Sequence, residues 1–248
     1  MSKLAIVAIS DTHNRHKAIK ELKVENALGG DIIIHAGDAT GQGAISEVAN
    51  FLKWYGKLDF SHRILIAGNH DWLFETNPSL AKDMCEQNGI ILLNDSSVII
   101  DGVKIHGSPV TPFFCDWAFN RARDINEAQF RKIREIKPHW DMIPDDTNIL
   151  ITHGPPYGIL DELVYVSGDP KGQFAGCVKL SERIKELKQL KHHIFGHIHN
   201  WGGKTVEKDG IMYHNASSCD ECYDPTNTIT IIEYEKDQNG ISNKFFAE

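Results

Sequence analysis

Residues 64–71 read Ile-Leu-Ile-Ala-Gly-Asn-His-Asp. The apolar, β-branched half of this segment is typical of a buried strand, which we predict over residues 62–67. The polar half begins where the strand ends, and in an α/β sheet the loops at this edge converge on a ligand. The segment therefore predicts an α/β fold with functional side chains at the carboxyl end of a strand.

Four more apolar strands are predicted, and each is followed by a short polar cluster. The strands at 4–9, 31–35, 148–152 and 192–196 precede Asp11-Thr12-His13, Gly37-Asp38, His153-Gly154 and Gly196-His197-Ile198-His199. A lone cluster of this kind is usually a turn or a chance match, so the prediction rests on five clusters in one shared context. Buried carboxylates and imidazoles are costly unless they are paired, and a metal centre at the strand ends would pair them all.

The spacing within the clusters also suits a metal centre. In Asp-x-His and His-x-His at a strand end, alternate side chains share one side, so we expect Thr12 and Ile198 to point away. Glycines at 37, 68 and 196 permit a close approach of the backbone. Mixed carboxylate, imidazole and amide ligands favour Mn, Fe, Co, Ni or Zn over calcium, which prefers oxygen alone.

The order of the predicted elements indicates two packed sheets flanked by helices. In the first half, helices at 16–27, 43–55 and 78–88 alternate with the strands. From about residue 90, strand pairs dominate: 90–93, 98–100 and 103–106 with a turn at Asp101-Gly102, then 204–208 and 211–214 with a turn at Asp209-Gly210. Further helices are predicted at 126–136 and 179–190, and long loops at 107–125 and 154–176. No linker divides the chain, so we expect one domain over residues 1–248.

Composition narrows the class of protein. The chain has 248 residues and a net charge of −8, which argues against a stable nucleic-acid complex or membrane binding through bulk charge and favours a small substrate. The apolar run from Leu4 to Ile9 is too short for a signal sequence or a membrane span, so the default location is the cytoplasm. Five cysteines, an odd number, do not form a disulfide framework, and the C-x-x-C of Cys219 and Cys222 lacks the second pair that a zinc site needs.

The polar clusters resemble a known signature. Their order along the chain is similar to that of the calcineurin-like metallophosphoesterase superfamily. The resemblance extends to its metallophosphoesterase-domain branch, whose members are similar to class III cyclic nucleotide phosphodiesterases. This closer resemblance rests on Gly107-Ser108-Pro109, Trp117-Ala118-Phe119-Asn120, His153-Gly154-Pro155-Pro156, Asn215-Ala216-Ser217 and Pro225-Thr226-Asn227. It implies a four-layer α/β/β/α sandwich and two divalent metal ions, with Mn favoured.

The resemblance also implies roles for individual residues. It assigns one metal to Asp11, His13, Asp38 and His199, and the second to Asp38, Asn69, His153 and His197, so Asp38 bridges the two ions. It places His70 at the phosphate as a catalytic residue that assists the leaving group. An alternative for His70 is an orienting role next to the ligands.

One motif departs from the pattern of the Ser/Thr protein phosphatases in this superfamily. Those enzymes continue the second motif as Gly-Asp-x-x-Asp-Arg-Gly, whereas residues 37–43 here read Gly-Asp-Ala-Thr-Gly-Gln-Gly. The carboxylate that would orient the catalytic histidine and the arginine that would bind phosphate are both missing from the motif. We therefore expect another group, with Asp71 as the candidate, to orient His70, and we disfavour a phosphoprotein phosphatase.

The expected activity is hydrolysis of small phosphodiesters by a metal-bound hydroxide, with cyclic nucleotides as the leading natural substrates. Aromatic residues in the long loops could stack on a flat leaving group or anchor the loops. Trp117, Asn120 and Asn200 are the candidate substrate contacts. The alternatives are a phosphomonoesterase or nuclease on the same site, and a weakly active scaffold protein.

Overall fold

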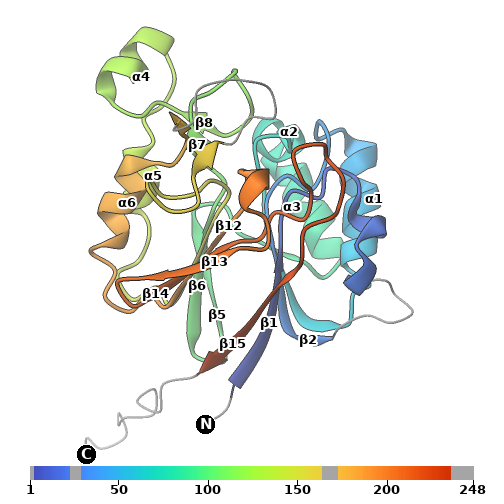
Figure 1. Ribbon diagram of the computed structural model, residues 1–248. Coiled ribbons are helices and arrows are strands. Elements are labelled where there is room, and N and C mark those ends of the chain that lie inside the picture. The colour runs from blue at the N-terminus through green and yellow to red at the C-terminus, as the bar shows by residue number, and fades with distance from the viewer. Residues whose placement is uncertain (1–2, 23–28, 164–172, 236–248) are drawn as a thin grey trace, which may run out of the picture.

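The computed structural model describes residues 3–22, 29–163 and 173–235. Two large mixed sheets lie face to face between two groups of helices (Figure 1), which confirms the predicted four-layer α/β/β/α sandwich. The first sheet has the strand order β15-β1-β2-β3-β4, in which β15 is antiparallel to β1 and the other neighbours are parallel. Its strands are β1 (Lys3–Ile9), β2 (Gly30–Ala36), β3 (Phe60–Ile66), β4 (Ile91–Leu92) and β15 (Thr230–Glu235).

The second sheet has the order β13-β14-β12-β9-β6-β5. Its four middle strands are parallel, and a hairpin partner pairs antiparallel at each edge. Its strands are β5 (Ser96–Ile100), β6 (Val103–Ser108), β9 (Ile149–Thr152), β12 (His192–Phe195), β13 (Thr205–Lys208) and β14 (Ile211–Asn215). Two small ribbons pair β7 (Thr111–Pro112) with β8 (Asn120–Arg121), and β10 (Glu162–Leu163) with β11 (Gln173–Phe174).

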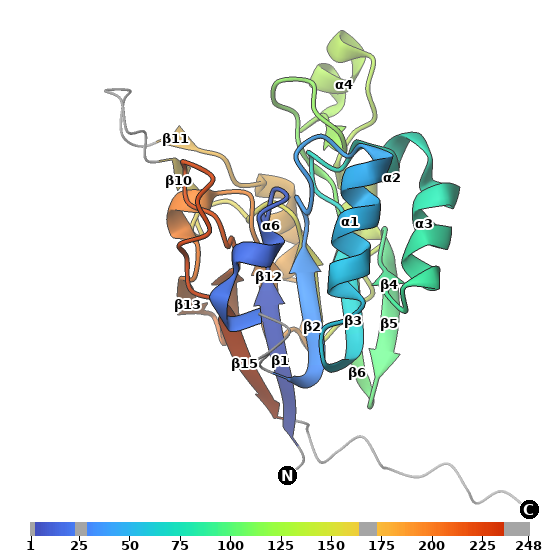
Figure 2. The same ribbon diagram turned by 90° about the vertical axis from the view of Figure 1, so that its right-hand side faces the viewer.

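Helices cover the outer side of each sheet. Figure 2 shows α1 (Ile45–Tyr55), α2 (Trp72–Thr76) and α3 (Pro78–Gln87) on the outer side of the first sheet. Across the molecule, α5 (Lys137–Asp141) and α6 (Val178–Ile184) lie against the second sheet, and α4 (Ile125–Arg131) lies beyond its end (Figure 1).

The side-chain pattern explains the four layers. On β2, Ile32 and Ile34 point into the core between the two sheets, whereas Ile33 points the other way. Ile33 belongs to the same cluster as Phe51 and Tyr55 of α1. A third cluster lies between the second sheet and its helices. Because successive strand residues face opposite sides, a continuous apolar strand can be buried on both faces.

Both predicted hairpin turns are confirmed. Asp101 and Gly102 have φ of 49° and 82° between β5 and β6, and Asp209 and Gly210 have φ of 54° and 77° between β13 and β14. Two consecutive residues with positive φ match the twist of the flanking strands, which is why Asp-Gly is favoured there.

Some predicted helices have different bounds. The helix predicted at 16–27 consists, over its described part, of two 3-10 turns, η1 (His16–Ala18) and η2 (Lys20–Leu22), and residues 23–27 lie outside the described residues. The helix predicted at 126–136 ends at Arg131, because Lys132 adopts a left-handed conformation with φ of 57°. The helix predicted at 179–190 spans 178–184.

Two further observations concern membrane-spanning helices and cysteines. Within the described part of the chain, no helix combines the length and apolar character that a membrane crossing requires. All five cysteines have free thiols, and Cys85, Cys177 and Cys219 are buried, as predicted for most of them.

Candidate metal centre

Every candidate ligand lies just beyond the carboxyl end of a central strand, as predicted. The loop after β1 carries Asp11 and His13, and the loops after β2 and β3 carry Asp38 and Asn69. From the second sheet, the loop after β9 carries His153, and the loop after β12 carries His197 and His199. The two sheets thus bring residues that are up to 188 positions apart to one edge of the sandwich.

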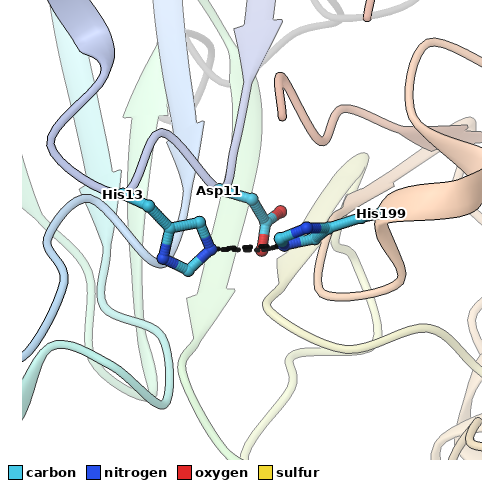
Figure 3. A group of neighbouring side chains, drawn as sticks. All are labelled: Asp11, His13 and His199. Carbon is cyan, nitrogen blue, oxygen red and sulfur yellow. Dashed lines mark hydrogen bonds and ion pairs between the residues drawn. The ribbon is translucent and has the colours of Figure 1, made fainter. Parts of the chain in front are cut away.

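The first group of side chains is Asp11, His13 and His199 (Figure 3). The Nε2 atoms of the two imidazoles are 3.2 Å apart and both face the Asp11 carboxylate. Asp11 Oδ1 lies 3.4 Å from His199 Nε2 and 3.9 Å from His13 Nε2. Three donor atoms that converge in this way can coordinate one divalent cation.

The second group is Asp38, His153 and His197. Asp38 Oδ2 lies 3.2 Å from His153 Nε2 and 3.8 Å from His13 Nε2, so this carboxylate lies between the two groups. Asn69 Oδ1 lies 2.9 Å from His153 Nε2, which adds the amide to the second group. The placement is the one expected of a bridging Asp38, and the full ligand assignment stays a prediction.

Backbone carbonyls orient two of the imidazoles. His153 Nδ1 is 2.9 Å from Ala36 O, and His199 Nδ1 is 2.9 Å from Asp220 O. A carbonyl oxygen accepts hydrogen bonds, so in each ring Nδ1 carries the donated proton. Nε2 is then the atom left for a metal, the arrangement by which proteins fix the orientation of a ligating histidine.

Three glycines allow the ligands to come together, as predicted. A Cβ on Gly196 would lie 2.0 Å from Asp11 Oδ2, and one on Gly68 would lie 2.2 Å from Asp38 Oδ1. Gly37 has a φ of 100°, and a Cβ there would lie 2.5 Å from His153 Nδ1. A side chain at any of these positions would displace a candidate ligand.

Several ligands lie on strained backbone. Asp11, His13, Asp38 and His197 have φ of 50°, 39°, 55° and 69°, in the left-handed region that favours glycine. Such conformations cost free energy and persist where the surrounding structure holds them, often at functional sites. Here two backbone hydrogen bonds join the loop after β1 to the loop after β2, from Asp11 N to Gly37 O and from His13 N to Asp38 O.

The carboxylates of the centre are ionised. Burial alone would raise the pKa of Asp11, but the neighbouring imidazole of His199 lowers it well below the usual value. Burial would also raise the pKa of Asp38, but the neighbouring imidazole of His153 lowers it below the usual value. Burial lowers the pKa of His13 to about 4 and that of His197 to about 3, so both rings are neutral and can act as ligands near pH 7.

The arrangement fits divalent metal ions. Asp11 Oδ1 is buried and accepts no hydrogen bond from any described residue, although the other oxygen of the same carboxylate accepts from His197 N and Ser217 Oγ. A buried carboxylate oxygen without a donor is costly unless a cation binds it. Mixed carboxylate, imidazole and amide donors suit a borderline divalent metal. Asp11, His13 and His199 would hold one ion and Asp38, Asn69, His153 and His197 the other.

His70 lies beside the first group. Its Nδ1 donates to Gly41 O over 2.7 Å, and its Nε2 points toward the centre, 4.0 Å from Asp38 Oδ2. The Gly41 carbonyl thus orients this imidazole, which corrects the expectation that Asp71 does so. A backbone carbonyl has no signature in the sequence.

Asp71 instead accepts hydrogen bonds from two of the loops. Its buried carboxylate accepts from the backbone N–H groups of Gly68, Ala39 and Thr40 and from the Thr40 hydroxyl, at 2.6–3.2 Å. These bonds tie the loop after β2 to the loop after β3. Asp71 therefore shapes the backbone that presents Asp38 and Asn69.

A cavity of about 300 Å³ opens over the centre. Asn200, one of the candidate substrate contacts, lines it, while the Asn200 amide also donates to Glu162 O over 3.2 Å. Thr12 points away, as predicted, and contacts His35, whereas Ile198 is buried but touches the cavity. The residues that line the cavity are Asp38, Asn69, His70, Phe114, Leu163, His197, Ile198, His199, Asn200, Glu221 and Tyr223.

The two other candidate contacts lie elsewhere. Trp117 packs against the His70 ring at a centroid distance of 4.3 Å, and it lines a separate cavity of about 540 Å³. Asn120 lines that same cavity, and its amide bonds Phe114 N, Thr111 Oγ1 and Ala118 O. The placement of Asn120 gives it a structural role in its own loop and does not support a substrate contact.

The role of the loop at 218–227 at the centre was not predicted from the sequence. Asp220 supplies a carbonyl to His199, Tyr223 lines the cavity, and Asn227 donates to the His199 carbonyl over 3.2 Å. The motif Pro225-Thr226-Asn227 marked this loop, but nothing in the sequence connected Tyr223 with the centre.

Known proteins resemble the chain in sequence. The family model for calcineurin-like phosphoesterases matches residues 4–201. Over 255 aligned residues, the chain is 36% identical to metallophosphoesterase domain-containing protein 1 of Homo sapiens, and this match covers 94% of the chain and 72% of that protein. UPF0046 protein T07D4.2 of Caenorhabditis elegans is 30% identical, with 92% of the chain and 59% of that protein covered.

Solved structures share the fold at low sequence identity. Phosphopantetheinyl hydrolase from Mycobacterium tuberculosis superposes with a TM-score of 0.56 at 16% identity, with 92% of this chain and 95% of that one covered. The protein TT1561 of Thermus thermophilus gives 0.54 at 14% identity, with 94% and 99% covered. Because the sequence match spans most of the chain and includes all seven candidate ligands, the chain belongs to the calcineurin-like phosphoesterases, a family of metal-dependent phosphoester hydrolases with a dinuclear metal centre.

Proposed function

We propose that the chain is a phosphodiesterase that acts on small phosphodiesters, with 2′,3′- or 3′,5′-cyclic nucleotides as the leading natural class. We further propose manganese as the favoured metal and the cytoplasm as the place of action. One observation carries the choice of a diester: no Lys or Arg is found among the described residues that line the cavity over the centre, whereas Glu221 is. The charge of the substrate would therefore be met by the metal ions.

The charges favour a diester over a monoester. Two divalent ions would carry four positive charges, of which Asp11 and Asp38 would neutralise two, and Glu221 lowers the positive potential further. A diester phosphate carries a single negative charge near neutral pH, whereas a monoester approaches two. Among the described residues that line the cavity, none has a cationic Lys or Arg side chain that would offset the second charge.

Individual residues support hydrolysis at this position. When bound, two divalent ions would supply positive charge to the phosphate oxygens and would acidify a water molecule. The carbonyls of Ala36 and Asp220 leave Nε2 of His153 and His199 facing the ions. His70 is held at Nδ1 by Gly41 O, so a proton on its Nε2 would face the leaving oxygen of a bound ester.

Two alternatives, a nuclease and a weakly active scaffold protein, have less support. A nuclease would need a basic groove along a polymer, and the acidic composition of the chain does not favour one. A weakly active scaffold would be expected to have lost a ligand, yet all seven candidate ligands meet at the strand ends.

The test compares two chromogenic esters. The protein is stripped of metal with a chelator, reloaded with Mn, and assayed with bis-p-nitrophenyl phosphate and p-nitrophenyl phosphate. We expect the diester to be preferred, and activity to disappear on chelation and return with Mn. Preference for the monoester would identify a phosphatase, and hydrolysis that persists after complete metal removal would rule out the metal centre as its cause. Metal-loaded protein that hydrolyses neither ester would favour the scaffold.

A further inference from the structure

We propose that Tyr223 and Phe114 form an aromatic clamp that selects phosphodiesters with a planar aromatic ester group, such as an aryl or nucleoside group. The inference rests on the proposed function, because it names the substrate class of the same site. Both rings line the cavity over the centre, and each contacts a different group of candidate ligands.

Tyr223 lies over the first group. Its ring centroid is 4.7 Å from that of His13 and 5.3 Å from that of His199, with interplanar angles of 82° and 85°. Although both contacts bury part of the ring, 44% of the residue surface stays exposed. A large aromatic side chain that is exposed inside a cavity offers apolar area to a ligand.

The loop around Tyr223 holds this ring in place. The Asp220 carboxylate accepts from Cys222 N, Asp224 N and Thr226 Oγ1 at 2.9–3.0 Å. Asn227 Nδ2 donates to Cys219 O over 2.9 Å and closes the loop. A ring that is positioned before the ligand arrives loses little conformational entropy on binding.

Phe114 lies over the second group. Its ring centroid is 5.1 Å from that of His197, with an interplanar angle of 63°. Asn120 Oδ1 accepts from Phe114 N over 2.9 Å and so fixes the backbone that presents this ring. Asn120 is therefore a positioning residue for the clamp.

The two rings together define the ligand. A phosphate bound at the metal ions would place its ester groups in the cavity, between walls that carry Phe114, Tyr223 and Leu163. A planar aromatic group gains stacking and apolar contact there, whereas a methyl group gains little of either. Each base that stacks on an aromatic side chain contributes enough to change affinity by about tenfold or more.

Ligand binding tests the clamp separately from turnover, because diphenyl and dimethyl phosphate lack the activated leaving group of a nitrophenyl ester and the heat of binding is read before they are hydrolysed. The Mn-loaded full-length protein is titrated calorimetrically with diphenyl phosphate and with dimethyl phosphate, and metal content is measured for every variant. We expect the wild type to prefer the diphenyl ester, and Tyr223→Ala and Phe114→Ala each to reduce that preference by about tenfold. Tyr223→Leu, which keeps apolar bulk against His13 and His199 but lacks a flat ring, should reduce it as well, and Tyr223→Phe should retain it.

Phe130→Ala is the matched control, since Phe130 on α4 is 84% exposed and lies outside the cavity lining. Its preference should equal that of the wild type. Equal binding of the two esters by the wild type, or an unchanged preference in the Tyr223 and Phe114 variants, would overturn the clamp even if phosphodiesterase activity is found. Conversely, a preference that these variants lose would establish the clamp even if no diester is hydrolysed.

Discussion

His199 Nδ1 donates to the backbone carbonyl of Asp220 over 2.9 Å, across 21 positions of the chain. The bond connects a candidate ligand on the loop after β12 with the loop that carries Tyr223. The imidazole that faces the metal position is therefore held by a segment that supplies no ligand itself. Substitutions in that segment should therefore alter metal binding at the centre.

Asn227→Ala tests this connection. Asn227 donates to the carbonyls of both His199 and Cys219, so its loss would remove one of the two bonds between the loop and His199 and leave the bond from His199 Nδ1 to Asp220 O less firmly positioned. Partners that orient a ligand typically contribute ten- to a hundredfold in metal affinity, so we expect retention of one metal ion to weaken by about tenfold. Competition with a chelator measures the effect, and Asn126→Ala on the exposed face of α4 should leave retention unchanged.

Asp38→Ala and His70→Ala should have separable effects. Asp38 lies between both groups of ligands, so its loss should abolish bound metal and activity together. His70→Ala should keep the metal and slow turnover by about a hundredfold, as expected for a residue that delivers a proton. Metal content and turnover, measured on the same samples, show whether the two effects are separate. If the His70 variant lost its metal, the histidine would be a ligand.

Asp71→Ala should act mainly on stability. Its removal leaves the buried N–H groups of Gly68, Ala39 and Thr40 without an acceptor. Each unsatisfied buried donor costs about 1–3 kcal/mol, so we expect the free energy of unfolding to fall by about 3 kcal/mol or more. Urea denaturation measures the fall, for which Asp83→Ala on the exposed face of α3 is the control. A variant of wild-type stability that has lost turnover would instead return Asp71 to a catalytic role.

Acid should destabilise the protein through a histidine pair on the second sheet. His192 Nδ1 and His214 Nε2 are 3.0 Å apart, and burial lowers their pKa values to about 4 and about 3. The unfolded chain binds more protons below its ordinary histidine pKa of about 6.5, so stability is lost as pH falls from there toward 4.

His214→Gln should make that loss shallower. Between pH 4 and 6, the variant should take up about one proton fewer on unfolding, which reduces the slope of stability against pH by about 1.4 kcal/mol per pH unit. Denaturation at several pH values gives the slope. An unchanged slope would show that His214 does not contribute to acid sensitivity.

The strand positions, and the polar clusters that follow the strands, were predictable because both depend on local patterns. The run at 64–66 has the composition of a buried strand, and Asn69 and His70 follow at its end. Strand β15 was missed although it carries a signal: Thr230–Glu235 alternates buried and exposed residues along its whole length. A period of two in the final part of the chain predicts an edge strand.

The groups that orient the ligands were not predictable. Gly41, Ala36 and Asp220 act through backbone carbonyls, which every residue type possesses. Whether a carbonyl meets an imidazole depends on how distant loops pack, and no spacing in the sequence encodes that. For the same reason, Asp71 was misplaced beside His70 when its partners are the amides of two loops.

The hydrogen bonds to Asp11 have a consequence for how the protein is made. Asp11 belongs to the start of the chain, yet its Oδ2 accepts from His197 N and from Ser217 Oγ, 206 positions away. A growing polypeptide cannot hold this carboxylate in place until residue 217 has left the ribosome, since the contacts that fix it are almost all distant in sequence. Metal capture therefore has to wait for the synthesis of residue 217, and we expect chains truncated before that residue to be free of hydrolytic activity.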